Sequence, residues 1–387
     1  MGLAALRGHN DALVLGLLRE AGAAGISRGE LAGRTGLTPQ AVSKITARLR
    51  AAGLAAEAGR RASTGGKPAT VLRLVPEAGY AVGLHLDRDE FLAVRVDLSG
   101  RVTARRAGPL DLGAGPAAVL EVAARAVVAL VRGAGPRLLG VGVAVPGPLD
   151  HLAGVLGRVT GFPEWEGVPL RDALAARLGR EPAVGAVPVV LDKDTNAGAL
   201  GVLGAAGAAG SAGPARTPAD GTAGTSAATG APGPGSFAYL HVGTGLGAGL
   251  VLDGVVRRGA RTGAGEFGHQ VVQLDGPVCA CGARGCVEVL CLAAVGRGEP
   301  AEAARLLGTA AANLVALLDL DRVVLGGRVV AAEPGAFVGG CGVVLAERAL
   351  GAYAPTVALA PSDAVPRGAA ELVLGPLFGP RRLLGPL

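Results

Sequence analysis

Two kinds of hydrophobic pattern alternate along most of the chain. Short apolar runs at residues 80–86, 91–98 and 138–145 predict strands, whereas the apolar positions of residues 117–131 recur with the period of an amphipathic helix. Alternating strands and helices are typical of α/β domains, in which helices cover the faces of a sheet. The chain beyond residue 76 is therefore predicted to be α/β.

The first 76 residues follow a different pattern, with two short helices predicted in the middle of the segment. Ser27 and Glu30 have the spacing of a capping box at the start of the first helix, and Gly36 can supply the turn that ends it. Thr38 is a suitable N-cap for the second helix, which begins with proline. This order predicts a helix-turn-helix.

The second helix has one buried stripe and one polar face. Its apolar residues recur at spacings of three and four: Val42, Ile45 and Leu49. The polar residues then face outward, as a recognition helix in the major groove of DNA requires. The residues predicted to contact DNA here are Thr38, Gln40, Ser43, Lys44 and Arg48.

A hairpin is predicted after this helix. Residues 54–57 and 69–74 can pair as strands around a basic loop that contains glycine, which is the arrangement of the wing in a winged helix. The residues predicted to reach phosphates or the minor groove are Arg60, Arg61 and Lys67. Two ordinary helices followed by a polar loop are the alternative interpretation.

The charge distribution favours nucleic-acid binding by this N-terminal segment. The whole chain has a net charge of +6, while residues 1–76 hold eleven Lys and Arg against four Asp and Glu, a net +7 that leaves −1 elsewhere. Basic side chains that neutralise phosphates release counterions and so promote binding. A basic face that is merely solvated would have the same composition.

We expect a cytoplasmic protein with no membrane partner. No run of about 18 uncharged apolar residues occurs, and the N-terminus lacks the apolar segment of a signal peptide. The odd number of cysteines, five, also argues against a disulfide framework and in favour of a metal site or free thiols.

One histidine and three cysteines lie close together in the second half of the chain: His269, Cys279, Cys281 and Cys286. One nitrogen and three sulfur ligands make a closed tetrahedron, which is the pattern of a structural zinc site without an open position for activating water. A chance cluster of buried thiols is the alternative. Cys291 and Cys341 are expected to be buried thiols.

This segment resembles the signature of the ROK family of repressors and sugar kinases. It has Glu-Phe-Gly-His at residues 266–269, followed by Cys-Ala-Cys-Gly and Gly-Cys-Val-Glu within residues 279–288, and the N-terminal module resembles that of the family's repressors. The resemblance implies a zinc ion held by His269, Cys279, Cys281 and Cys286. It also implies sugar hydroxyls bound by Glu266, His269 and Glu288.

The resemblance further implies a two-lobed, actin-like (ribonuclease-H-like) α/β fold with the ligand in the cleft between the lobes. We expect a winged helix-turn-helix over residues 1–76 and a sugar-sensing domain over residues 77–387. The small lobe would comprise about residues 77–196 and the C-terminal tail, and the large lobe about residues 197–370. Residues 205–236, rich in Ala, Gly, Ser, Thr and Pro, are predicted to be a disordered insertion.

One departure from the family's kinases concerns the first phosphate loop. Kinases have Asp-x-Gly-Gly-Thr-Lys where this chain has His-Leu-Asp-Arg-Asp-Glu at residues 85–90. Asp87 and Arg88 replace two glycines, so their side chains would keep phosphate from the backbone amides, and Asp87, Asp89 and Glu90 would repel it. A second glycine-rich loop, residues 243–249, remains.

A second departure lies at the catalytic segment, where kinases have Asn-Asp and this chain has Lys193 and Asp194. Asp194 is expected to accept a hydrogen bond from bound sugar instead of acting as a catalytic base. Lys193 would pair with Asp192 or Asp194, bind an anionic group of the ligand, or remain solvated. Trp165 would either help to close over the sugar or belong to the core.

The sequence thus predicts a DNA-binding regulator, in the simplest case a repressor of carbohydrate-metabolism genes, that binds operator DNA as a homodimer or higher oligomer. A sugar or sugar-phosphate would control it. The alternatives are an ATP-dependent sugar kinase with a DNA-binding arm and a DNA-binding protein with a vestigial sugar site. The altered first loop argues against the kinase, and the complete set of sugar-binding residues argues against the vestigial site.

Overall fold

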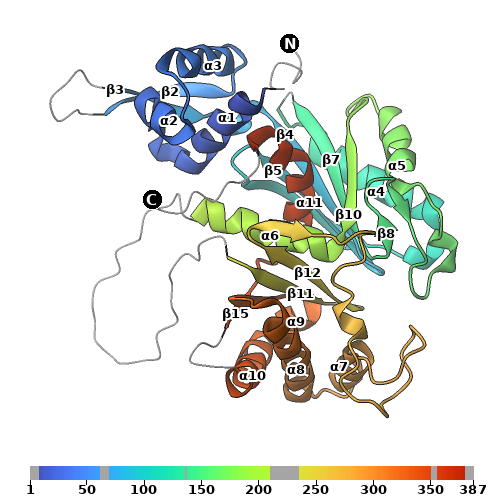
Figure 1. Cartoon of the computed structure of the whole chain (residues 1–387). Helices are drawn as coiled ribbons and strands as arrows, with labels where there is room; N and C mark the ends of the chain where they lie inside the picture. Colours follow the sequence, from blue (N-terminus) through green and yellow to red (C-terminus); the bar gives the residue numbers. More distant parts are fainter. Residues whose placement is uncertain (1–7, 62–68, 136, 210–234, 350–354, 380–387) are drawn as a thin grey trace.

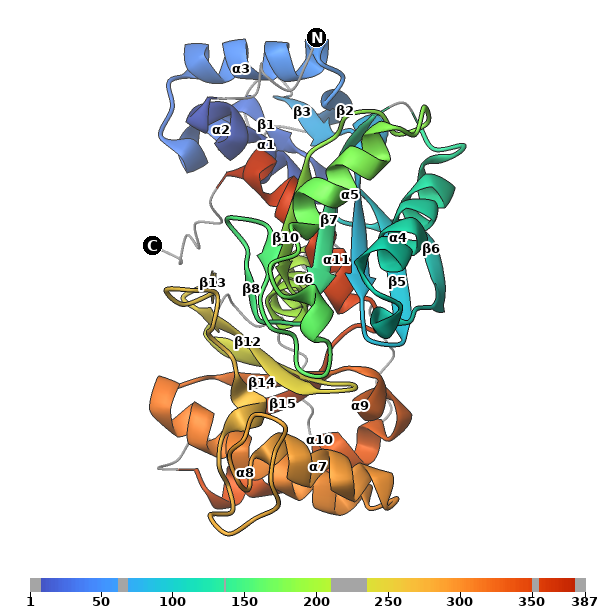
Figure 2. The ribbon, with the colours of Figure 1, turned by 90° about the vertical axis from the view of Figure 1, so that its right-hand side faces the viewer.

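The computed structural model describes residues 8–61, 69–135, 137–209, 235–349 and 355–379. An N-terminal module and two α/β lobes lie in a row, and each lobe is built on its own five-stranded sheet (Figure 1 and Figure 2). The predicted two-lobed α/β fold is confirmed.

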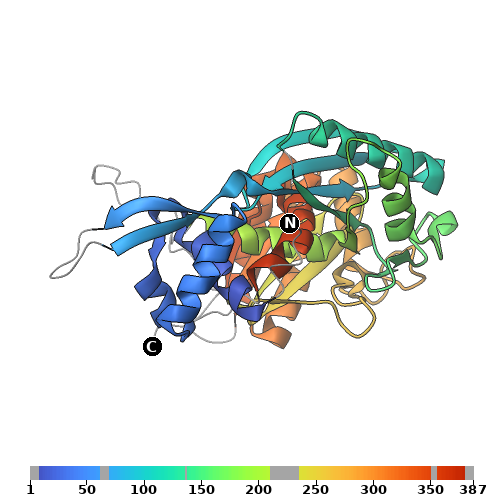
Figure 3. The same ribbon diagram turned by 90° about the horizontal axis from the view of Figure 1, so that it is seen from above.

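The N-terminal module consists of three helices and a small antiparallel sheet. Its helices are α1 (His9–Ala21), α2 (Arg28–Thr35) and α3 (Pro39–Ala51), and its strands lie in the order β1 (Ile26–Ser27), β3 (Ala69–Leu74) and β2 (Ala55–Arg61). Figure 3 shows β2 and β3 extending away from the lobes. The strand β2 runs further than predicted because a bulge after Glu57 lets the pairing with β3 continue.

The predicted local signals of this module are confirmed. The Ser27 hydroxyl accepts a hydrogen bond from the Glu30 amide at 3.2 Å, and the Glu30 carboxylate accepts one from the Ser27 amide at 2.8 Å. Gly36 ends α2 in the left-handed conformation, with φ at 71°. The Thr38 hydroxyl caps α3 by accepting from the amide of Ala41. The apolar stripe of α3 is buried: Val42, Ile45 and Leu49.

The first lobe contains a mixed sheet with helices on both faces. Its strands lie in the order β10 (Val189–Lys193), β7 (Leu138–Val145), β4 (Tyr80–Leu86), β5 (Glu90–Asp97) and β6 (Val102–Pro109). The helices α4 (Pro116–Val131) and α5 (Leu170–Gly179) cover one face, and α11 (Ala364–Leu374) covers the other. A separate hairpin consists of β8 (Leu149–Asp150) and β9 (Val155–Leu156). The strands predicted at residues 80–86, 91–98 and 138–145 are confirmed to within one residue.

The second lobe contains another mixed sheet. Its strands lie in the order β13 (Val255–Arg257), β12 (Leu246–Leu252), β11 (Phe237–Val242), β14 (Arg322–Gly326) and β15 (Thr356–Leu359). One face packs against α7 (Val287–Gly296), α8 (Pro300–Leu318) and α10 (Pro334–Glu347), with the short α9 (Arg328–Ala332) after β14. The other face packs against α6 (Asp194–Ala209).

Short 3₁₀ turns occur in all three parts of the described structure. They are η2 (Gly22–Ala24), η3 (Pro76–Ala78), η4 (Leu112–Ala114), η5 (Pro163–Trp165), η6 (Phe267–His269) and η7 (Gly375–Phe378).

The start of the predicted insertion at residues 205–236 is helical. The helix α6 continues to Ala209, because alanine has the highest helix propensity and four of residues 205–209 are alanine. The prediction of disorder is therefore wrong for these residues. Residues 210–234, the greater part of the insertion, lie outside the described residues.

The helix α8 is long and apolar enough to cross a membrane by length and composition. Its buried face, which includes Leu307, packs with α7 and α10 in the core of the second lobe. Glu302 and Arg305 form an ion pair on its exposed side. These contacts are those of a core helix.

The helices α6 and α11 lie side by side between the two sheets (Figure 1). Their backbones touch through glycine: a Cβ atom on Gly368 would come within 1.6 Å of the carbonyl oxygen of Ala197. α6 begins at the cleft between the lobes, and α11 runs towards the N-terminal module. This helix pair therefore connects the cleft between the lobes with the N-terminal module.

The N-terminal module shares a hydrophobic core with the first lobe. Leu15 and Leu18 of α1 belong to the same buried cluster as Leu374 of α11 and Phe378 of η7. The cluster also includes residues of β4 and β5, which ties the module directly to the first sheet. The module is thus docked along α1.

A buried ion pair reinforces this junction. The Arg19 guanidinium of α1 donates to both carboxylate oxygens of Glu371 on α11, and the two side chains are only 12% and 6% exposed. The guanidinium carbon also lies 4.4 Å from the centre of the Phe378 ring, within the range of a cation–π contact.

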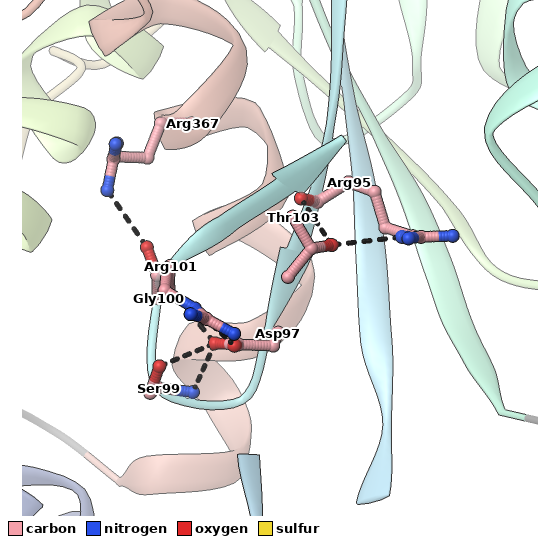
Figure 4. A network of polar contacts seen from close by, with 7 residues as sticks. All are labelled: Arg95, Asp97, Ser99, Gly100, Arg101, Thr103 and Arg367. Atoms are coloured by element: carbon pink, nitrogen blue, oxygen red, sulfur yellow. Dashed lines mark hydrogen bonds and ion pairs between the residues drawn. The ribbon is translucent and has the colours of Figure 1, made fainter. Parts of the chain in front are cut away.

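The turn between β5 and β6 lies at the same junction (Figure 4). The Asp97 carboxylate accepts hydrogen bonds from the amides of Ser99 and Arg101 at 2.9 and 3.1 Å, which fixes the shape of the turn. Arg367 of α11 then donates to the carbonyl oxygen of Gly100 at 2.9 Å. A Cβ atom on Gly100 would lie 2.7 Å from the guanidinium of Arg19, so this turn fits closely against the ion pair.

Candidate ligand and metal site

A cavity of about 340 Å³ lies between the two lobes. The strands β4, β7 and β10 are parallel neighbours, so the turns that follow them meet at one edge of the first sheet and line the cavity. The opposite wall comes from β11, from the turn before β12, and from residues 265–288. The residues predicted to bind sugar all line this one cavity: Lys193, Asp194, Glu266, His269 and Glu288.

Asp194 stands where β10 ends and α6 begins. Its carboxylate accepts a hydrogen bond from the Thr195 amide at 2.6 Å. Burial raises the pKa of Asp194 above its ordinary value, and the nearby charge of Asp87 adds to this effect. A partly buried carboxyl that lines a cavity is suited to hydrogen bonding with the hydroxyl groups of a ligand.

Lys193 spans the cleft. Its buried ammonium donates to the carbonyl oxygen of Ala264 at 2.6 Å and pairs with Glu266 at 3.1 Å, and both partners belong to the second lobe. The expected pairing with Asp192 or Asp194, and the alternative of a solvated lysine, are therefore wrong. Consecutive residues of a strand point to opposite faces, so the Asp192 carboxylate turns away from the ammonium and binds Arg258 at 2.7 Å.

Glu288 lies in the first turn of α7. One carboxylate oxygen accepts from the Leu246 amide at 2.8 Å, which holds the side chain against the glycine-containing turn before β12. The Glu266 side chain is half exposed, and one of its carboxylate oxygens forms an ion pair with the Lys193 ammonium. The two carboxylates therefore reach the cavity from different elements of the same wall.

The turn between β4 and β5 is filled by its own side chains, as predicted. Asp87 is buried and accepts hydrogen bonds from the Arg88 amide at 2.7 Å and from the Thr244 hydroxyl of the second lobe at 3.1 Å. Asp89 is bound by Arg328 at 2.7 Å. The repulsion of phosphate expected from Asp89 is thus smaller than predicted, because an arginine already neutralises that carboxylate.

Two histidines beside this turn were not identified from the sequence. His241 lines the cavity and its Nδ1 lies 2.9 Å from the Tyr239 hydroxyl. His85 lies edge-on to His241, with ring centres 5.8 Å apart, and burial lowers the pKa of His85 to about 4, so the ring is uncharged at neutral pH. Isolated histidines at strand ends have no spacing signal that would single them out.

Trp165 belongs to the core. Its ring is 1% exposed and its indole N–H donates to the carbonyl oxygen of Leu112 at 3.0 Å, so it does not face the cavity. The segment before it contributes Arg158 and Thr160 to the cavity wall instead. Neither of these residues was singled out from the sequence.

The predicted metal ligands converge on one point. The ligand atoms of His269, Cys279, Cys281 and Cys286 all lie within 4.8 Å of one another. The Cys279 sulfur is 3.7 Å from Nδ1 of His269, and the Cys281 and Cys286 sulfurs are also 3.7 Å apart. A tetrahedron with metal–sulfur bonds of 2.3 Å has edges of roughly 3.8 Å, so the spacing fits a metal of the size of zinc.

Short backbone bridges hold these ligands together. Val271 pairs with Cys286, and Val278 pairs with Arg284, which closes the loop that contains Cys279. Cys291 and Cys341 lie elsewhere and are fully buried, as predicted, and burial raises the pKa of each to about 12. Those two thiols are therefore unreactive core residues.

The predicted recognition helix α3 lies on the surface at the end of the molecule opposite the second lobe (Figure 2). The side chains of Gln40, Ser43, Lys44 and Arg48 are exposed on it. Arg48 is not free, however, because its guanidinium pairs with the buried Asp11 of α1.

The other predicted DNA contacts are only partly described. The Thr38 hydroxyl is engaged in capping α3, which orients the helix, and Arg60 is exposed on β2. Arg61 ends β2, but its side chain lies outside the described residues, as does the whole of Lys67.

Comparisons with known proteins agree with this architecture. The model of the ROK family matches residues 224–296, which include the four predicted metal ligands. A xylose repressor from Caldicellulosiruptor bescii is 28% identical over 266 residues, covering 68% of this chain and 59% of the relative. The chain spans about three fifths of the length of the curated xylose repressors that it matches.

Solved structures include close matches to the fold. A ROK family transcriptional regulator, a homologue of the E. coli MLC protein, superposes with a TM-score of 0.70 at 20% identity, covering 96% of this chain and 97% of the other. The ROK hexokinase from Thermus thermophilus has a TM-score of 0.54 at 29% identity, covering 75% and 96%. The sequence motif, the sequence relatives and the fold are all similar to those of ROK family proteins.

Proposed function

We propose that this chain is a cytoplasmic transcriptional repressor that binds operator DNA through its N-terminal module and is controlled by a sugar bound between the lobes. The observation that carries the proposal is the convergence of Lys193, Asp194, Glu266, His269 and Glu288 on one cavity in a chain that also has an exposed basic helix. The similarity to xylose repressors supports a carbohydrate-responsive role. A homodimer would present two such helices to the two halves of an operator.

In this proposal the metal is a structural zinc ion held by His269 and the three cysteines. Four protein ligands would leave no open position, so zinc would fix the loop and not activate water. Because Nδ1 of His269 faces the cysteine sulfurs, the other ring nitrogen is available to the cavity that this residue lines. The metal would thereby orient one of the sugar-binding groups.

We further propose that the cavity senses sugar without phosphorylating it. In the turn after β4, the Arg88 amide already donates to the Asp87 carboxylate, and Asp87 is also bonded to Thr244 across the cleft. This arrangement leaves little access for a nucleotide polyphosphate to backbone amides there. A ROK kinase remains the competing function, since ROK kinases share this fold.

Replacing Glu266 or Glu288 by glutamine is expected to weaken sugar binding by about 10- to 100-fold, because a hydrogen bond to a charged acceptor is lost in each case. Calorimetry against a panel of hexoses and pentoses would measure the effect. Glu347→Gln, at an exposed position at the end of α10, is the control and should bind as the wild type does. DNA binding by the ligand-free variants should be unchanged. Unaltered sugar affinity in both variants would place the sugar elsewhere, and measurable phosphorylation with ATP and Mg²⁺ would restore the kinase.

Lys44→Ala is expected to weaken binding to DNA about 5- to 100-fold and to change sequence preference, whereas Arg60→Ala should weaken binding uniformly and lower the log–log salt slope by about 0.9. Anisotropy titrations on sequences selected by the wild-type protein from a random pool would measure both. Arg132→Ala, exposed in the first lobe, is the charge-matched control. Equal affinity of all four proteins would mean that α3 and β2 do not face DNA.

A further inference from the structure

We propose that the sugar recognised in this cavity carries an anionic group, a phosphate or a carboxylate, and that Arg88 binds that group. This inference rests on the function proposed above, since it concerns the ligand of the same cavity. It is carried by the position of Arg88 and by the absence of a charged partner for it among the described residues.

The backbone of Arg88 is fixed on both sides. Its amide donates to the Asp87 carboxylate at 2.7 Å, and its carbonyl oxygen accepts from the Leu112 amide at 2.9 Å. The half-buried side chain then extends into the cavity, where its guanidinium carbon lies 5.9 Å from the centre of the Phe162 ring. Because the backbone is fixed, the side chain lies at the cavity before a ligand binds, which lowers the entropic cost of binding.

The guanidinium of Arg88 lies next to the turn at Gly245. A Cβ atom on Gly245 would lie 3.5 Å from an Arg88 nitrogen and 3.2 Å from a carboxylate oxygen of Glu288. Because residue 245 is glycine, this point between the two side chains is open to the cavity. A sugar whose hydroxyl binds Glu288 would therefore bring its neighbouring substituents within reach of Arg88.

The same turn offers backbone donors. Within the described ranges, the amides of Thr244 and Gly245 have no hydrogen-bond acceptor. Successive amides in a glycine turn form a concave donor surface that suits an oxyanion. Together with the planar, two-pronged guanidinium of Arg88, they would surround the oxygens of a phosphate or a carboxylate.

Among the described residues, no charged group that lines the cavity forms an ion pair with Arg88. Lys193 and Glu266 neutralise one another, and Asp87 is occupied by Thr244 and by the backbone. Among the residues that the structure describes, the guanidinium of Arg88 has neither an ion pair nor a hydrogen bond, although several carboxylates line the same cavity. A half-buried cation without a partner is unfavourable, and an anionic ligand would relieve that cost.

The test compares matched ligands on the whole protein. Calorimetry and thermal shift would be measured with a set of monosaccharides, each as the neutral sugar, its phosphorylated form and its carboxylate form. For the wild type, at least one charged form should bind about 10- to 100-fold more tightly than its neutral counterpart. Comparison of the two charged forms decides between phosphate and carboxylate, and inorganic phosphate alone tests binding of the ion without the sugar.

Arg88→Gln should abolish the preference for the charged form while neutral sugars keep their affinity, and Arg88→Lys should retain part of it. Arg106→Gln, at an exposed position on β6, is the matched control. Equal binding of neutral and charged sugars by the wild type, or a preference that survives in Arg88→Gln, overturns the role of Arg88 and leaves the sugar sensor intact. If no member of any set binds, the proposed function itself fails.

Discussion

Replacing Cys281 by serine is expected to reduce the bound zinc from about one ion per chain to almost none, because the tetrahedron loses one of its four ligands. Cys281 is the exposed member of the ligand set, whereas Cys279 and Cys286 are buried. Its replacement therefore tests coordination without disturbing the core. Freed from the metal, the loop between residues 269 and 286 should become accessible to proteases, and His269 should lose its fixed orientation towards the cavity.

Elemental analysis, limited proteolysis and sugar titration would measure the three effects. Ala280→Ser introduces the same side chain at the neighbouring exposed position and should keep its metal. Treatment of the wild type with a chelator should reproduce the behaviour of Cys281→Ser. Wild-type protein that is folded, protease-resistant at this loop and free of zinc would contradict the assignment.

Glu371→Leu is expected to lower the free energy of unfolding by about 3 to 5 kcal/mol, because the Arg19 guanidinium would remain buried without its carboxylate. The double variant Arg19→Met, Glu371→Leu should recover part of this loss, since apolar side chains of similar volume can replace a buried ion pair. Breaking this contact should also loosen α1 and expose the N-terminal module to hydrogen exchange. Denaturant titration and exchange of the amides in α1 would measure both effects.

The exposed pair between Arg34 and Glu20 provides the comparison. These side chains are 45% and 56% exposed, so Arg34→Met should change the free energy of unfolding by about 1 kcal/mol or less. A Glu371→Leu variant as stable as Arg34→Met would mean that the junction between the module and the first lobe does not depend on the ion pair.

The features that could be predicted from the sequence are those encoded by neighbouring residues. The strands at residues 80–86 and 138–145 are buried along all or nearly all of their length, so they form largely apolar runs that are visible in the sequence. The capping box at Ser27 and Glu30 and the cysteine spacing are also local patterns. In each case the partners lie within about ten residues of one another.

The features that could not be predicted depend on contacts between distant parts of the chain. The partner of Lys193 is Glu266, 73 positions away, and that of Arg19 is Glu371, 352 positions away. No periodicity or motif connects such residues, and two of the neighbouring acids in the sequence, Asp192 and Glu20, bind other arginines. Arg88 likewise appears in the sequence only as a disruption of a phosphate loop, whereas its place in the cavity follows from the packing of the two lobes.

The shared core between α1 and α11 also determines how this protein can be recombined. The apolar face of α1 is completed by Leu374 and Phe378, which come from the opposite end of the chain. A graft of residues 8–76 onto another regulator would expose this face to water unless residues 364–379 were transplanted as well. New DNA specificity would therefore be engineered most safely on the outer surface of α3, with the two ends of the chain left together.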